Sequence, residues 1–80
     1  MVPPFFIIRI DMVHIGQVIQ EEIRKQGRTV SWFAQQLFCD RSNVYKIFKK
    51  ESIDSALLVR ISIILKRDFF QLYSEDIYRK

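Results

Sequence analysis

The sequence predicts an all-α domain of five short helices, preceded by a short extended segment. Three observations support this fold class. The chain has 80 residues, enough for one hydrophobic core and no second domain. Hydrophobic residues make up 49% of it, and only two Gly and two Pro interrupt it. Apolar residues recur at intervals of three and four along most of its length, which is the period of an amphipathic helix.

Residues 1–12 are predicted to form a tail or an edge strand. Two prolines oppose a helix there, and the apolar run Phe5–Ile10 is rich in β-forming residues. Charged residues interrupt this run, which is too short to span a bilayer and lacks the features of a signal peptide. Met12 offers an alternative translation start, in which case the tail lies outside the functional domain.

Residues 13–74 are predicted to form the helical domain. Its first helix, between His14 and Gln26, places on one face Ile15, Val18, Ile19 and Ile23. Gly27 supplies the helix stop.

Two helices joined by a tight turn follow. Thr29 is a good N-cap for a helix over Val30–Phe38, and Asp40 is one for a helix that begins at Arg41. Their inward positions hold Phe33, Ala34, Leu37, Val44, Ile47 and Phe48. A helix-turn-helix of this kind places its second helix in the major groove of DNA.

Two more helices complete the domain. Asp54 or Ser55 caps the fourth, whose apolar face consists of Leu57, Leu58, Ile61, Ile64 and Leu65. Asp68 caps the fifth, whose aromatic and aliphatic residues close the core or form a dimer interface: Phe69, Phe70, Leu72 and Tyr73. Residues 75–80 are predicted to form a polar C-terminal tail.

The net charge of +4 indicates an acidic partner, either nucleic acid or an anionic membrane. Between Arg41 and Lys50 there are four cations and no acid, which places the charge on the second helix of the motif. One Cys and one His form neither an internal disulfide nor a zinc site, which fits the cytoplasm. No catalytic residue, metal site, cofactor or small-molecule ligand is predicted, and an enzyme is not expected.

Several short pieces occur in a characteristic order between Ile15 and Tyr73. They are Ile15-Gly16, Gly27-Arg28-Thr29, Ala34 and Leu37, Arg41-Ser42, Val44 and Ile47, Ala56-Leu57-Leu58, the run from Ile61 to Leu65, and Asp68-Phe69-Phe70. This combination resembles the lambda-repressor-like domain, also called the XRE-type helix-turn-helix family. The resemblance implies a compact five-helix domain that binds double-stranded DNA sequence-specifically, as transcriptional regulators do.

Resemblance and position together assign the DNA contacts. The predicted base contacts are Arg41, Ser42, Asn43 and Lys46. The predicted phosphate contacts are Arg28, Thr29, Ser31, Tyr45, Lys49 and Lys50. Other roles remain open, because Ser42 and Asn43 can bond to Asp40 instead, Tyr45 can pack half-buried, and any lysine can be a surface charge.

Two positions depart from the family pattern. Val30 stands where the family often has a Gln that contacts a phosphate, so the hydroxyls of Thr29 and Ser31 would take over that contact. Phe38 stands where the family usually has Gly, and a positive φ there would strain it or require a rearranged turn.

Three remaining side chains are given structural roles. Trp32 is expected in the core or a dimer contact, Cys39 as a buried packing thiol, and His14 as an exposed residue at a helix start. A homodimer is expected, because such motifs usually bind paired half-sites. The rival interpretation is a protein-interaction module or an antitoxin-type component that binds a protein partner.

Overall fold

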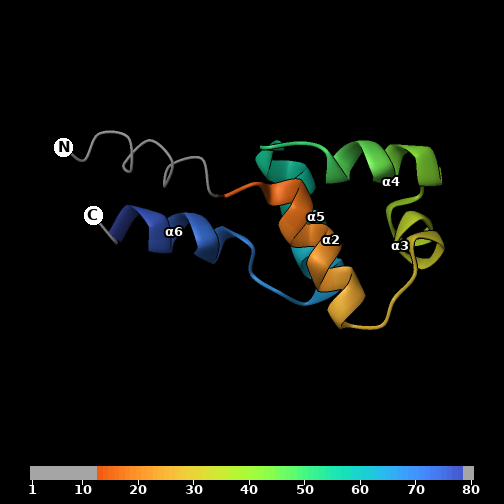
Figure 1. Ribbon diagram of the computed structural model, residues 1–80, viewed down its shortest axis with the longest axis horizontal. Coiled ribbons are helices and arrows are strands. Elements are labelled where there is room, and N and C mark those ends of the chain that lie inside the picture. The colour runs from red at the N-terminus through yellow and green to blue at the C-terminus, as the bar shows by residue number, and fades with distance from the viewer. Residues whose placement is uncertain (1–12, 79–80) are drawn as a thin grey trace.

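The computed structural model describes residues 13–78, which fold into five helices (Figure 1). The helices are α2 (Ile15–Lys25), α3 (Val30–Leu37), α4 (Arg41–Phe48), α5 (Ser55–Leu65) and α6 (Phe70–Tyr78). This range contains no strand, so the prediction of an all-α domain is confirmed. The tail or edge strand predicted for residues 1–12 lies outside the described residues.

The predicted caps start two of the helices. The Oγ1 atom of Thr29 accepts a hydrogen bond from the Trp32 N–H at 3.0 Å, and Asp54 Oδ1 accepts one from the Leu57 N–H at 2.8 Å. Asp40 does precede α4, but its side chain makes no cap hydrogen bond. Only the backbone of Asp40 takes part in the hydrogen bonding at the start of α4, where its carbonyl accepts from the Asn43 N–H at 3.0 Å.

Helices α2, α3 and α5 are each followed by a residue in the left-handed conformation, whereas α4 is not. Gly27, after α2, has a φ of 72°, and the Arg28 N–H reaches back to the Ile23 carbonyl at 3.0 Å in a Schellman motif. Phe38 ends α3 in the same way with a φ of 58°, although it is not glycine. The turn is therefore not rearranged, and Phe38 is held in a conformation that disfavours its Cβ by about 1–2 kcal/mol.

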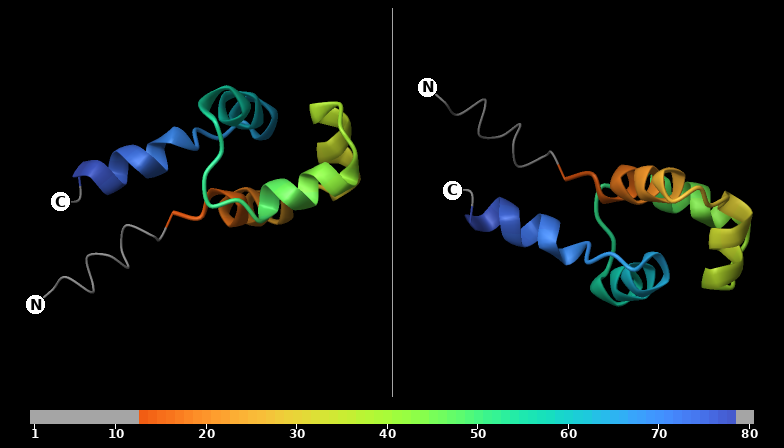
Figure 2. Two further views of the ribbon diagram at one scale, coloured as in Figure 1. Left: turned by 90° about the horizontal axis from the view of Figure 1, so that it is seen from above. Right: turned by 90° about the horizontal axis from the view of Figure 1, so that it is seen from below.

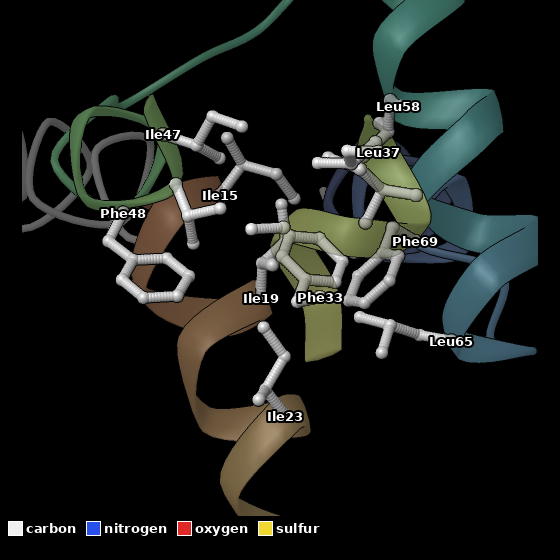
Figure 3. Close-up of a cluster of buried hydrophobic side chains, with 13 residues drawn as sticks. Ile15, Ile19, Ile23, Phe33, Leu37, Ile47, Phe48, Leu58, Leu65 and Phe69 are labelled. Atoms are coloured by element: carbon white, nitrogen blue, oxygen red, sulfur yellow. The ribbon is translucent and has the colours of Figure 1, made fainter. Parts of the chain in front are cut away.

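The core is formed by one face of each helix from α2 to α5 together with Phe69 (Figure 3). Its members are Ile15, Ile19, Ile23, Phe33, Ala34, Leu37, Val44, Ile47, Phe48, Leu58, Ile61, Leu65 and Phe69. Among the described residues no polar or charged side chain is buried. Phe69 closes the core as expected, whereas Phe70, Leu72 and Tyr73 are only half-buried against it.

Helix α6 extends away from the other helices in every view (Figures 1 and 2). It continues to Tyr78 and buries none of its residues. Polar composition predicts a C-terminal tail over residues 75–80, whereas residues 75–78 are helical. This stretch contains neither Gly nor Pro, the residues that most often stop a helix.

Two groups of contacts hold the helices in place. At the start of α2, the N–H groups of Ile15 and Gly16 donate to the carbonyls of Glu51 and Lys50, which follow α4, at 3.3 and 2.9 Å. At the end of α2, Gln26 Nε2 donates to the Leu65 carbonyl at 2.8 Å. The first group fixes α4 against α2 and so determines how α4 faces solvent.

Candidate nucleic-acid interface

The outer surface of α4 is the candidate site. Val44, Ile47 and Phe48 face the core, where α4 packs against α2 and α3. The remaining side chains of the helix are exposed: Arg41, Ser42, Asn43, Tyr45 and Lys46. Lys49 and Lys50 continue this exposed surface beyond the helix end. The same helix thus has an apolar face held by the fold and a polar, cationic face that the described chain leaves open.

Three of the predicted phosphate contacts lie elsewhere, at the start of α3. Arg28, Thr29 and Ser31 are exposed there. The Thr29 hydroxyl already accepts the cap hydrogen bond, and the Arg28 guanidinium lies over the Trp32 ring, 4.3 Å from its centroid. Such stacking restrains the guanidinium while its N–H groups remain available. Trp32 itself is half-buried against the core, as expected.

A hollow of about 390 Å³ borders α4 on its α2 side. Its walls come from two helices and the residue that caps α2: His14, Gln17, Gln20, Tyr45, Phe48 and Lys49. His14 is half-buried, not exposed as expected, and its Nδ1 accepts the cap hydrogen bond from the Gln17 N–H at 3.3 Å. The Tyr45 ring meets Phe48 edge-on at 6.1 Å between centroids, and Tyr45 is half exposed. Tyr45 is therefore partly packed, as one of the two roles considered for it requires, and its phosphate contact stays a prediction.

A second hollow, of about 290 Å³, borders α4 on its α5 side. It brings Asn43, Lys46 and Lys50 together with Arg60 of α5 over an apolar floor that includes Leu37 and Ile47. Cys39, expected as a buried packing thiol, is half-buried and also lines this hollow. Helix α4 therefore stands between two hollows, each with at least one cation on its wall.

The cations of this surface are free of acidic partners within residues 13–78. The ion pairs in that range are Arg24–Glu21 at 3.5 Å and Arg67–Glu22 at 2.7 Å. Neither involves α4 or the residues that line the two hollows. Unpaired cations on one surface create a positive potential that attracts an anionic partner.

Sequence reasoning did not identify Arg60, Gln17 or Gln20. Arg60 carried a signal, because it is the only charged residue in a helix that is otherwise apolar except for two serines, SALLVRISIIL. Gln17 and Gln20 carried none, since exposed glutamines on an amphipathic helix are ordinary. Their position beside α4 follows only from the packing of α2 against α4.

Comparisons with family models, curated proteins and solved structures find no match for this chain. Between residues 13 and 78, no cluster of three or more His, Cys, Asp or Glu side chains is arranged to hold a metal ion. None of the five described helices has the length and apolarity needed to cross a membrane.

Proposed function

We propose that this chain is a sequence-specific double-stranded DNA-binding domain of a cytoplasmic transcriptional regulator, of the lambda-repressor-like type. Helix α4 enters the major groove, where Arg41, Ser42, Asn43 and Lys46 contact base edges. One observation carries the proposal. The cationic surface of α4 is exposed and free of acidic partners within the described chain, while the opposite face of the helix is fixed in the core.

The dimensions of the surface support this function. An α-helix fits the major groove, which has a phosphate strand on each side. Helix α4 is flanked by two hollows with Lys49 on one wall and Lys46 and Lys50 on the other. The hollows lie on either side of α4, so these cations are suited to contact phosphates and to hold the helix in register.

A homodimer accompanies this proposal. Paired half-sites require a two-fold partner. Helix α5 exposes two apolar side chains one turn apart, since Val59 is 46% and Ile63 is 69% exposed. An exposed apolar patch on a small domain is a candidate protein contact, and the two-fold symmetry of paired DNA half-sites favours a second copy of the chain as the partner.

Selection of duplexes from a random library tests the function directly. We expect one enriched, palindromic sequence. Arg41→Ala should then lose about 1–3 kcal/mol of discrimination between that site and its base-pair variants. Lys49→Ala should weaken binding to all duplexes alike. It should also reduce the salt slope, which is the steepness with which log K falls with the logarithm of salt concentration, by about 0.9. Arg24→Ala is the matched control, because Arg24 is exposed on α2 and lines neither hollow.

A protein-binding module of the antitoxin type is the second candidate. It is favoured by Phe38, which is 89% exposed in the turn just before α4. An apolar side chain of this size suits a pocket on a protein partner better than a phosphate strand. Failure of the wild-type chain to bind any duplex in moderate salt, together with stoichiometric capture of a protein partner, would favour this function over DNA binding.

A further inference from the structure

The hollow between α4 and α5 gathers three cations from separate parts of the chain. Lys46 comes from α4, Lys50 from the loop after it, and Arg60 from the second turn of α5. Asn43 adds an amide to the same wall, and no Asp or Glu lines the hollow. Like charges brought together in this way repel one another, and an anion in the hollow would remove the repulsion.

We infer that this hollow is a phosphate-binding site for the backbone of duplex DNA, in which Arg60 is a principal ligand. The inference rests on the proposed function and extends its footprint from α4 to α5. Arg60 then contacts DNA without reading its sequence, because a phosphate is the same at every base step.

The position of the Arg60 side chain supports this role. Its Nη2 atom donates to the carbonyl of Leu37, the last residue of α3, at 3.4 Å. This long hydrogen bond uses one of the five guanidinium donors, and the Arg60 side chain makes no other hydrogen bond among the described residues. The bond holds the planar group at the wall of the hollow, so less side-chain entropy is lost when the remaining donors bind a phosphate.

Duplex phosphate fits the hollow better than an independent small anion does. Asn43 and Lys46 are shared between the hollow and the proposed base contacts, so a phosphate beside the major groove arrives as α4 enters. A strand also presents phosphates in series, which suits cations supplied by two helices and a loop. Each phosphate neutralised releases counterions, and this release makes binding depend on salt.

The test uses the full chain with a duplex of fixed sequence and compares Arg60→Gln, Arg60→Lys and the control Arg24→Ala. Gln removes the charge but keeps an N–H donor for the Leu37 carbonyl, whereas Lys keeps the charge. Binding constants are measured over a range of salt concentrations, and thermal melting checks that each variant is folded.

We expect Arg60→Gln to bind roughly tenfold more weakly at low salt, as for loss of one charge-assisted hydrogen bond. Its salt slope should fall by about 0.9, while Arg60→Lys and Arg24→Ala keep the wild-type slope. The loss should be equal for the selected site and for unrelated duplexes. If the wild-type chain binds duplexes but Arg60→Gln has an unchanged slope, the inference is wrong and the proposed function stands.

A separate titration distinguishes binding of duplex phosphate from binding of a free anion. It is monitored through the NMR signals of the Asn43 and Arg60 side chains. Duplex should shift these signals, whereas inorganic phosphate alone should not do so at the same phosphate concentration. Equal shifts with inorganic phosphate would assign the hollow to a small anion and overturn the inference. Absence of any duplex binding by the wild-type chain would overturn both the proposed function and the inference.

Discussion

Gly16 is the position where one added methyl group should disturb this fold most. It lies in the first turn of α2, against the end of α4. A Cβ there would stand 2.3 Å from the carbonyl oxygen of Ile47 and 2.4 Å from that of Phe48. Real Cβ atoms stay at least 3.0 Å from such atoms, so Gly16→Ala must separate the two helices by at least 0.7 Å.

The expected loss of stability follows from three terms. Forcing a methyl group into a packed contact destabilises by about 1–3 kcal/mol. The hydrogen bonds from the N–H groups of Ile15 and Gly16 to the loop after α4 lengthen, and each loses about 1 kcal/mol of stabilisation. The helix preference of Ala offsets about 0.5–1 kcal/mol. The free energy of unfolding should therefore fall by about 3 kcal/mol, and Tm by roughly 12–24 °C.

Urea and thermal unfolding followed by circular dichroism measure this loss. Gly27→Ala is the matched control, because nothing lies within 4 Å of its added Cβ and only the φ of +72° opposes it. That strain should amount to about 1 kcal/mol. Gly16→Ala must therefore be clearly the less stable variant. Equal midpoints for Gly16→Ala and the wild-type chain would show that α2 and α4 do not approach this closely.

Three further changes have outcomes that the structure specifies. Phe38→Gly should raise the free energy of unfolding by about 0.5–1 kcal/mol, since it removes left-handed strain from a side chain that is 89% exposed; a lower Tm would contradict this. The pKa of Glu22 is lowered below its ordinary value of 4.5, mainly because its carboxylate accepts a hydrogen bond from Gln26 and, to a smaller extent, because it accepts one from the positively charged Arg67. The resulting stabilisation is present above that value and is lost as the pH falls below it, so Glu22→Gln should be less stable than wild type at neutral pH and equal to it in strong acid. Ile63→Lys should abolish the proposed homodimer in sedimentation experiments, and an unchanged mass would exclude this face of α5 as the contact.

The fold could be predicted to a large extent because most of its signals are local. Residue type alone predicts Thr29 as one cap and either Asp54 or Ser55 as another, and the side chains of Thr29 and Asp54 accept the expected hydrogen bonds. Gly27 was identified as a helix stop, and its positive φ follows from the same local requirement. The buried face of α4 was also predicted, since Val44 and Ile47 recur at the spacing that points them to one side.

What escaped prediction depends on packing between helices that are distant in sequence. Gly16 stood out only as part of a family pattern, whereas its contact with the end of α4 needs the relative placement of two helices. The same holds for Arg60, which ordinary helix periodicity places on a solvent face. Its approach to Lys46 and Lys50 arises because α5 returns past the end of α3, to which Arg60 is hydrogen-bonded.

Phe38 connects the question of stability with the question of function. Its backbone conformation disfavours a side chain by about 1–2 kcal/mol, and an 89% exposed ring recovers little of this by packing. Glycine would serve the turn better, so stability alone does not explain the residue. Both proposed functions offer this exposed ring, beside α4, a contact with a partner. In the major groove the thymine methyl group is the apolar feature available to such a ring, whereas a protein partner can provide a whole pocket. The effect of Phe38→Gly on duplex affinity therefore tests the role of Phe38: weaker binding places its ring in the groove, and unchanged binding leaves it for a protein partner.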